Sequence, residues 1–299
     1  MAVLAEIQQD IQRVARHVGA SVVGIGERWG VGSGVVVDPG RVLTNAHNLR
    51  SERVLVTFAD GQTADGQVRG LDYDKDLAVV EVDTGASAAI EWATDAAPEI
   101  GAPVFALANP GGGGLRVTVG FVTGIERTFR GPRGRRITGT IEHDAPLLPG
   151  SSGGPIVTPE GRLLGLNTNR LGEGFYLAIP ADENLRTLVE ALTRGEAVAR
   201  PRLGIGVAPG HIARRLRRAV GLPDADGVLV RQVEGGSPAS QAGLAHGDLI
   251  VAAAGRPIHG IDDLFEAVDS AHDGGIELTV IRGAEERTVV VNLSQQSDG

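Results

Sequence analysis

The feature that most constrains this chain is a series of short apolar stretches between residues 21 and 180, which no helical pattern interrupts. The stretches are rich in β-branched residues and are bounded by glycine, proline, aspartate or asparagine, as in GSGVVV, RVLTNA, LAVVEV and PVFALA. Such stretches are typical of strands joined by tight turns. Because no helix separates them, the pattern disfavours a βαβ fold and predicts a mainly β, antiparallel domain.

The length of 299 residues fits two domains. Apolar residues at helical spacing predict a helix at the N-terminus, and they are Leu4, Ile7, Ile11, Val14 and Val18. A second helical stripe follows Pro180 and ends near Gly195. From these boundaries we expect an N-terminal helix at 1–20, a β domain at 21–195, a linker at 196–199, a small α+β domain at 200–294 and a disordered tail at 295–299.

Composition disfavours several classes of function. The net charge of −9 argues against nonspecific binding to nucleic acid, because such binding depends on neutralising phosphates. The chain has no cysteine, and its histidines form no metal-ligand pair, so we expect neither a metal nor a cofactor. No apolar run is long enough to span a membrane, and no signal peptide is recognisable. A cytoplasmic protein is expected, although a chain trimmed of an export segment would look the same and would be extracytoplasmic.

Three separated motifs together predict nucleophilic catalysis. LTNAHN places His47 after an apolar strand, DYDKDLAVVEV places Asp76 before another, and LPGSSGGPIV places Ser152 in a glycine-rich turn. A serine hydroxyl needs a base to remove its proton, and a histidine base needs a carboxylate to hold its tautomer. The order His, Asp, Ser matches the double β-barrel serine proteases and neither subtilisin nor the α/β-hydrolases.

Each motif alone has a structural interpretation. SSGGP could be an ordinary turn, and His47 could be a structural histidine. Asp72 and Asp74 compete with Asp76 for its role. The glycines favour catalysis, because backbone amides beside a nucleophile must stay uncovered to bind an oxyanion. We expect Gly150 and Ser152 to donate to it, with Ser151 between them.

At these residues the sequence resembles the HtrA/Deg family of trypsin-like serine proteases that carry a PDZ domain. HDAPLLPGSSGGPIV is similar to the family signature T-D-A-x-x-x-P-G-N-S-G-G-P, with Ser151 and Leu148 in place of the usual asparagines. GRVLTNAHN and DKDLAVVEV are similar to the segments of the catalytic histidine and aspartate. The resemblance implies a chymotrypsin-like double β-barrel followed by a small α+β PDZ domain.

The resemblance also implies roles for particular residues. His47 would be the general base, Asp76 its orienting carboxylate and Ser152 the nucleophile. The segment LGLNTN would pair with substrate backbone and place three residues near the specificity pocket, namely Leu166, Asn167 and Thr168. No acidic residue precedes Ser152 in the pocket-forming turn, so a small aliphatic side chain is expected before the cleaved bond.

The segments RLGIGV and GSPASQAGLAHGDLIVAAAGRPI resemble a PDZ domain. The resemblance implies a loop that binds a C-terminal carboxylate, formed by Leu203, Gly204, Ile205 and Gly206. A helix at 261–271 would form the other wall of the groove, with Leu264 and Val268 facing the peptide. A spacer domain that binds no ligand is the alternative.

The favoured function is an ATP-independent serine endopeptidase for protein quality control, which cleaves unfolded or damaged proteins and binds peptide C-termini at its PDZ groove. No Walker motif is present to supply nucleotide energy. A catalytically latent chaperone or PDZ binding protein is the alternative from another class, and an esterase is a third. A homo-oligomer is compatible with the family, although the N-terminal helix lacks the aromatic residues through which many relatives form trimers.

One charged segment stands apart from these motifs. ERTFRGPRGRRI, at 126–137, holds five arginines. We favour a solvated loop, because runs of charge usually face water. A regulatory or substrate-contacting loop beside the site is the alternative.

Overall fold

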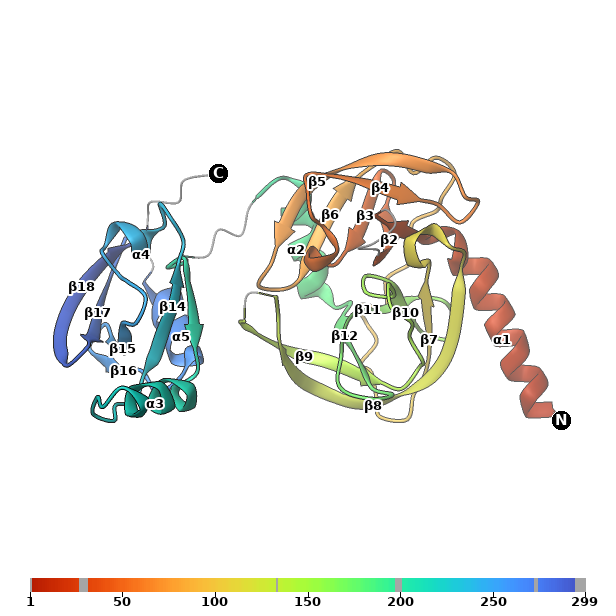
Figure 1. Ribbon diagram of the computed structural model, residues 1–299. Coiled ribbons are helices and arrows are strands. Elements are labelled where there is room, and N and C mark those ends of the chain that lie inside the picture. Colours follow the sequence, from red (N-terminus) through yellow and green to blue (C-terminus); the bar gives the residue numbers. More distant parts are fainter. Residues whose placement is uncertain (1, 27–31, 133, 197–200, 272–273, 294–299) are drawn as a thin grey trace. The chain divides into compact units, whose positions relative to one another are not determined.

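The computed structural model describes residues 2–26, 32–132, 134–196, 201–271 and 274–293. The chain divides into two compact units, Met1–Val198 and Ala199–Gly299, both of which are drawn in Figure 1. The predicted linker falls outside the described residues except for Glu196, and the predicted tail at 295–299 lies outside them.

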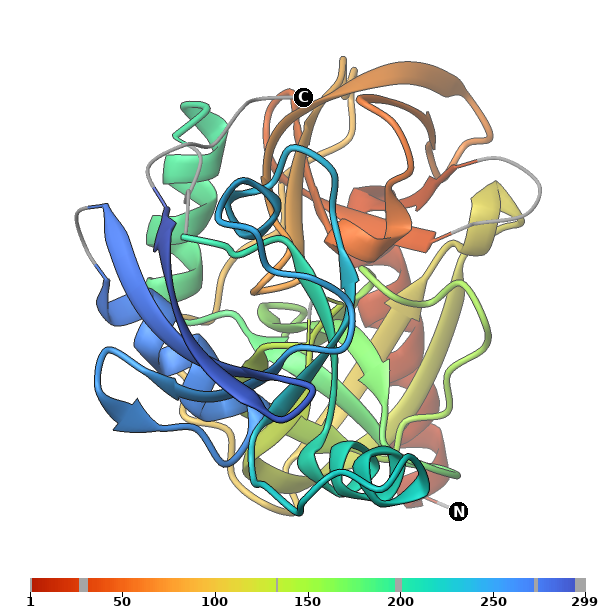
Figure 2. The ribbon, with the colours of Figure 1, turned by 60° about the vertical axis from the view of Figure 1, so that its left-hand side comes forward.

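The first unit holds two closed antiparallel β-barrels of six strands each, which lie side by side in Figures 1 and 2. The first barrel is formed by β1 (Val22–Ile25), β2 (Gly32–Asp38), β3 (Arg41–Thr44), β4 (Arg53–Thr57), β5 (Thr63–Asp72) and β6 (Leu77–Glu81). The second barrel is formed by β7 (Pro103–Ala108), β8 (Arg116–Arg130), β9 (Arg136–His143), β10 (Pro155–Val157), β11 (Leu163–Arg170) and β12 (Tyr176–Pro180). The expected double β-barrel is confirmed.

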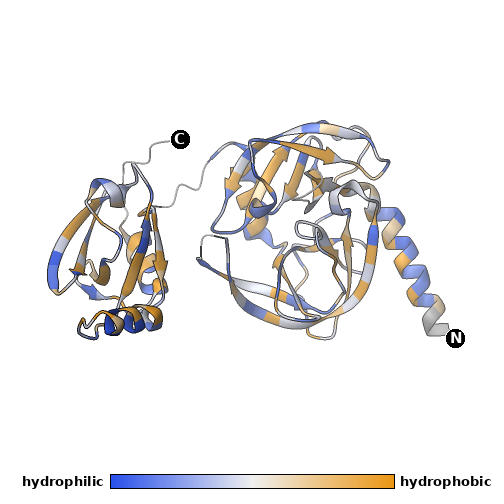
Figure 3. Cartoon of the chain, viewed as in Figure 1, coloured by the Kyte–Doolittle hydropathy of each residue, from blue (hydrophilic) through white to orange (hydrophobic). Residues whose placement is uncertain are grey.

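Continuous apolar runs arise because several strands bury both faces. Successive side chains on a strand point to opposite sides. Val36 packs inside the first barrel, whereas its neighbour Val35 packs in a core shared by the two barrels. Ile156 and Val157 divide in the same way in the second barrel. Figure 3 shows the resulting concentration of hydrophobic residues on the strands, and the shared core fixes one barrel against the other.

Two helices extend this shared core. Helix α1 (Ala2–Val18) buries Val14 and Val18 in it, whereas Ile7 of the predicted stripe is exposed. Helix α2 (Glu183–Thr193) follows the second barrel and begins at Asp182, whose carboxylate accepts from the Leu185 amide at 2.8 Å. Three short 3₁₀ turns complete the unit, namely η1 (Gly19–Ser21), η2 (Ala46–Asn48) and η3 (Pro110–Gly112).

The second unit is a small α+β domain with its own core. Its strands are β13 (Ile205–Ala208), β14 (Val228–Val233), β15 (Leu249–Ala253), β16 (Arg256–Pro257), β17 (Gly275–Arg282) and β18 (Glu285–Asn292). Its helices are α3 (Gly210–Ala219), α4 (Pro238–Gln241) and α5 (Ile261–Ser270). The strand order β13-β14-β15-β17-β18 leaves β13 at one edge of the sheet, where it pairs only with β14.

Candidate active site

Strand pairing in the first barrel brings the predicted histidine and aspartate together. Thr44 at the end of β3 lies opposite Ala78 in β6. His47 lies three residues beyond Thr44, and Asp76 lies two residues before Ala78. In an antiparallel pair these continuations meet at the same end of the ladder. The register therefore places both residues at one rim of the barrel.

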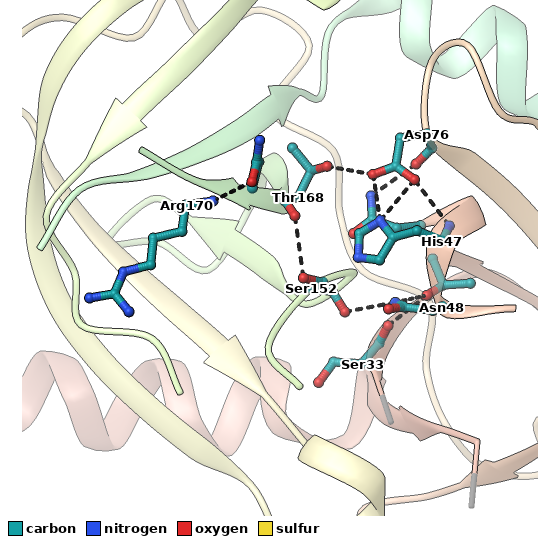
Figure 4. Close-up of polar contacts among 10 residues, drawn as sticks. Ser33, His47, Asn48, Asp76, Ser152, Thr168 and Arg170 are labelled. Carbon is teal, nitrogen blue, oxygen red and sulfur yellow. Dashed lines mark hydrogen bonds and ion pairs between the residues drawn. The ribbon is translucent and has the colours of Figure 1, made fainter. Parts of the chain in front are cut away.

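The imidazole of His47 is held by the carboxylate of Asp76 (Figure 4). Nδ1 lies 2.9 Å from Oδ1 and 2.8 Å from Oδ2, and the His47 backbone amide donates to Oδ1 at 3.1 Å. A carboxylate can only accept, so Nδ1 carries the proton and Nε2 is left as an acceptor. The imidazole is partly exposed, whereas Asp76 is buried. The tautomer with the proton on Nδ1 and a free Nε2 is the one that a general base requires.

Two further residues hold Asp76 from opposite sides. The Thr168 hydroxyl, from β11 of the second barrel, donates to Oδ2 at 2.6 Å. The Asn45 side-chain amide donates to the Asp76 carbonyl at 2.9 Å. Asp76 has a φ of 56°, which few residues other than glycine adopt and aspartate tolerates better than most. These bonds stabilise the left-handed backbone that aims the carboxylate at His47.

The three neighbouring aspartates, Asp72, Asp74 and Asp76, each bond to different partners. Asp72 accepts from the amides of Asp74 and Lys75 and so closes the turn before β6. Asp74 forms an ion pair with Arg135 at 3.1 Å, in which both side chains are largely buried. Of the three, Asp76 is the one that contacts the imidazole of His47. The sequence left this assignment open, and the geometry distinguishes the three carboxylates.

The predicted nucleophile lies in a turn between β9 and β10. The Ser151 amide donates to the Leu148 carbonyl at 3.1 Å, and Pro149 and Gly150 occupy the two central positions. The φ of 87° at Gly150 is the value that a type II turn requires at its third residue. A type I turn has a φ of about −90° there, with the Pro149–Gly150 peptide turned over. Glycine thus permits the orientation that presents its own amide.

Alternate amides of this turn have no hydrogen-bond partner among the described residues. The amides of Ser151, Gly153 and Gly154 donate to backbone carbonyls. The amides of Gly150 and Ser152 do not. Two neighbouring uncovered amides can stabilise an oxyanion. The predicted oxyanion site also includes Ser151. The Ser151 amide donates to the Leu148 carbonyl, so Ser151 separates the two uncovered amides without offering its own.

The hydroxyl of Ser152 donates to the carbonyl of Thr168 at 3.3 Å, as Figure 4 shows. Among the described residues no hydrogen bond joins it to His47, although both line the same cleft. The contact is longer than the usual 2.7–2.8 Å of a hydroxyl donor and is therefore weak. Catalytic hydrogen bonds in ligand-free enzymes are often formed only after substrate binds.

The cleft around Ser152 has a volume of about 500 Å³. One wall is formed by residues 129–132 of the arginine-rich hairpin between β8 and β9. The favoured interpretation of this segment as solvated fits the exposed Arg127, Arg130 and Arg136, but it is wrong for Phe129 and Arg135. Phe129 and Arg135 are buried, and the ion pair of Arg135 with Asp74 joins the hairpin to the turn that holds Asp76. Arg133 lies outside the described residues.

The three predicted pocket residues have different positions. Thr168 lines the cleft and bonds to both Asp76 and Ser152. Asn167 also lines it, but its side-chain amide donates to the Gly154 carbonyl at 3.0 Å. Leu166 is fully buried in the core between the barrels and does not line the cleft. Its predicted contact with substrate therefore finds no support.

A buried histidine contacts two of the residues that line the cleft. His143, at the end of β9, donates from Nε2 to Asn167 Oδ1 at 2.8 Å and stacks on the ring of Tyr176. Its Nδ1 is buried with no partner among the described residues. Burial lowers the pKa of His143 below its usual value, although the bond to Asn167 and the charge of Asp144 act in the opposite direction.

In the second unit, the predicted carboxylate loop precedes the edge strand. The carbonyls of Leu203 and Gly204 accept backbone amides within the domain, whereas their own amides have no partner among the described residues. Ile205 and Gly206 begin β13, whose outer edge pairs with no strand in the described part of the chain. Leu264 and Val268 of α5 are each 3% exposed and belong to the domain core, so their predicted contact with a peptide stays a prediction.

Comparison with known proteins gives matches for both units. Residues 32–166 match the family model of a trypsin-like peptidase domain, and residues 229–282 match that of a PDZ domain. The chain is 34% identical to HhoA of Synechocystis over 89% of this chain and 71% of that protein. It is 33% identical to Protease Do-like 1 of Arabidopsis thaliana over 90% of this chain, but it spans only 64% of that relative. The serine endoprotease of Yersinia pestis has a similar structure, with a TM-score of 0.61, 27% identity and coverage of 94% and 96%.

The two barrels and the matched domains define a trypsin-like serine endopeptidase joined to a PDZ domain. Within that class, the chain belongs to the HtrA/Deg family of serine proteases. No helix in the described part of the chain is long and apolar enough to cross a membrane.

Proposed function

We propose that the chain hydrolyses peptide bonds with Ser152 as nucleophile, His47 as general base and Asp76 as the carboxylate that orients the base. The observation that carries this proposal is the pairing of His47 Nδ1 with Asp76 across a cleft from the two uncovered amides beside Ser152. A base with an available Nε2 and a prepared oxyanion site are the two elements that acyl transfer needs.

The reaction begins when the Ser152 hydroxyl leaves the Thr168 carbonyl and turns to His47 Nε2. His47 takes the proton as Oγ attacks the substrate carbonyl carbon, and the amides of Gly150 and Ser152 donate to the resulting oxyanion. The imidazolium, stabilised by Asp76, then protonates the leaving amine. Water repeats the sequence on the acyl-enzyme and releases the acid.

An extended substrate would pair with the end of β11. Strand β10 pairs with β11 only as far as Leu166, and the Asn167 backbone is occupied by Gly153 and Gly154. Thr168, Asn169 and Arg170 line the cleft, so a substrate could approach the end of β11 from that side. A substrate amide would displace the Ser152 hydroxyl from the Thr168 carbonyl. Binding would thus release the nucleophile.

This form of recognition favours unfolded or damaged proteins as substrates, because only an extended chain can add to a strand edge. The sequence holds no nucleotide-binding motif, which supports ATP-independent cleavage. At the cleavage position, the expectation of a small aliphatic side chain remains a prediction. A library of internally quenched peptides with varied residues before the scissile bond would test it.

Casein hydrolysis by the wild type and by Ser152→Ala tests the proposal. We expect Ser152→Ala to lose hydrolysis, and a fluorophosphonate probe to label Ser152 in the wild type. Equal hydrolysis by both proteins would exclude Ser152 as the nucleophile. Labelling without any peptide cleavage, but with cleavage of short esters, would favour an esterase. Absence of both would favour the latent chaperone or binding protein.

We propose further that the second unit binds peptide C-termini along the unpaired edge of β13. The uncovered amides of Leu203 and Gly204, beside the left-handed backbone of Gly204 at φ 74°, would donate to a terminal carboxylate. Fluorescence anisotropy with peptides that differ only in a free or amidated C-terminus tests this on the full chain. Equal affinity for both forms would leave a spacer domain as the better account.

The oligomeric state and the compartment remain predictions. Sedimentation equilibrium would distinguish a monomer from a trimer. Immunoblotting of cell fractions would test the cytoplasmic location expected for the printed sequence against the extracytoplasmic alternative.

A further inference from the structure

The carbonyls of Gly150 and Ser152 accept hydrogen bonds, whereas the amides of the same two residues have no partner among the described residues. The Gly150 carbonyl accepts from the Ser33 hydroxyl at 2.9 Å. The Ser152 carbonyl accepts two bonds, from the Ser33 amide at 2.8 Å and from the Asn48 side-chain amide at 2.9 Å. Both donors belong to the first barrel, whereas the turn belongs to the second. The turn is therefore fixed from across the interface between the barrels.

Ser33, Thr44 and Asn48 form one connected group, which we call the cross-barrel clamp; Figure 4 labels its members Ser33 and Asn48. The Thr44 hydroxyl donates to the Ser33 carbonyl at 2.7 Å. Asn48 Nδ2 donates to the Thr44 hydroxyl at 3.0 Å and, with its other hydrogen, to the Ser152 carbonyl. Since Nδ2 has two hydrogens, both are used. Ser33 and Thr44 are fully buried, so these bonds are shielded from water.

Close packing surrounds the clamp. A Cβ at Gly153 would lie 2.1 Å from the Ser33 carbonyl oxygen, and a Cβ at Gly32 would lie 2.3 Å from Asn48 Cγ. Neither distance is tolerated between such atoms. Glycine at these two positions lets the turn approach the clamp and gives the Asn48 side chain its space.

We propose that Asn48 is a positioning residue for the oxyanion donors, acting through the Ser152 carbonyl, and that Ser33 supports it. This proposal rests on the proposed function of Ser152. Asn48 directly follows His47 in the turn η2, so one side chain joins the turn of the base to the turn of the nucleophile. The bonds to the Gly150 and Ser152 carbonyls hold the backbone on both sides of the Ser151–Ser152 peptide, which carries the Ser152 amide. The clamp therefore restricts displacement of that amide and of the Ser152 Cα, without touching substrate.

Asn48→Leu is the primary test, because leucine keeps the bulk of asparagine and removes its two donors. We expect kcat on a short peptide substrate to fall roughly tenfold to a hundredfold, less than the loss of a whole oxyanion donor, with KM changed less than twofold. Affinity for a peptidyl boronic acid should fall by the same factor as kcat/KM, because its tetrahedral adduct occupies the oxyanion site. Affinity for the matching uncleaved peptide amide, measured with Ser152→Ala as background, should not change.

Asn184→Leu is the matched control, because Asn184 is exposed and bonds only locally to Asp182. It should retain wild-type kcat and boronate affinity. Thr44→Val removes the hydroxyl that Asn48 holds while preserving shape, and it provides a second variant should Asn48→Leu not fold. We expect a smaller loss of the same kind. Circular dichroism and thermal melting establish that each variant is folded.

Two outcomes would overturn the proposal. One is a folded Asn48→Leu protein with kcat within twofold of the wild type. The other is a lower kcat with unchanged boronate affinity, which would place the effect outside the oxyanion site. Failure of the proposed function gives a different result, since the wild type itself would then not be labelled by fluorophosphonate at Ser152.

Discussion

His47 and Ser152 are held very differently, although both line one cleft. The imidazole of His47 is fixed by a carboxylate that itself accepts from Thr168 and belongs to a backbone held by Asn45. The hydroxyl of Ser152 has one weak bond to the Thr168 carbonyl, while its backbone carbonyl accepts two strong ones. The proposed base is thus fixed through its side chain, whereas the proposed nucleophile is fixed through its backbone.

This difference between His47 and Ser152 indicates which side chain must move in the proposed mechanism. Tautomer and ring orientation must exist before substrate arrives, because the base has no other way to acquire them. The serine hydroxyl needs only a rotation about one bond to reach Nε2. Thr168 joins the two arrangements, since its hydroxyl holds Asp76 and its carbonyl holds Ser152.

The largest expected loss of kcat follows from removing the side chain of His47 or of Ser152. His47→Ala and Ser152→Ala should each lower kcat by on the order of 10⁶-fold, and the double variant should lose no more than either one, because the triad acts as a unit. Active-site-titrated assays with a peptide substrate measure this. A near-native rate for His47→Ala at pH 7 would show that another group is the base.

A smaller effect should follow from changing the backbone that prepares the nucleophile. In Gly150→Ala the φ of 87° becomes unfavourable, so the turn should shift toward type I and withdraw its amide from the cleft. We expect kcat to fall about 10²–10³-fold, as for loss of one oxyanion donor. Unchanged kcat in a folded Gly150→Ala protein would remove this amide from the mechanism.

The link between the two arrangements can be tested at Thr168. Thr168→Ala removes the 2.6 Å hydrogen bond to Asp76 and leaves the backbone carbonyl in place. A hydrogen bond to a charged group contributes about 1.5–3 kcal/mol, so kcat should fall at least about tenfold. Thr168→Ser should restore most of the rate, because serine retains the hydroxyl. Equal rates for the alanine and serine variants would contradict this role.

The smallest effect concerns stability at low pH. Burial lowers the pKa of His143, so the unfolded state binds a proton below the usual value of 6.5 while the folded state still does not. The free energy of unfolding should therefore fall as pH drops below about 6.5, by up to about 1.4 kcal/mol per pH unit. His143→Gln should make the profile flatter. Urea unfolding between pH 5 and pH 7.5 measures both slopes, and parallel profiles would exclude His143 as the source.

The sequence predicted the fold class because strand alternation, turn residues and helical stripes are local signals. The residues proposed to carry the chemistry could also be selected from the sequence, since His47, Asp76 and Ser152 each lie in a recognisable motif beside an apolar strand. The sequence could not show which of three neighbouring aspartates contacts His47. Asp72, Asp74 and Asp76 are the same residue type, and they differ in the partners that the fold brings to them.

Predictions for other residues also depended on contacts with distant segments. Leu166 directly precedes residues that line the cleft, yet its own side chain packs in the core between the barrels, which only the folded chain shows. Arg135 belongs to a charged run that suggests a solvated loop, yet one buried carboxylate 61 positions away fixes it against the active site. The role of Asn48 was also missed; its position directly after His47 was the available signal.

A crystal structure of the wild-type protein with a peptidyl boronic acid tests the central claim most directly. We predict a bond from Ser152 Oγ to boron, with Oγ withdrawn from the Thr168 carbonyl and one boronate oxygen within hydrogen-bonding distance of the Gly150 and Ser152 amides. His47 Nε2 should lie within the same range of Oγ or of a boronate oxygen. An adduct at another residue, or a boronate oxygen directed away from both amides, would contradict the account.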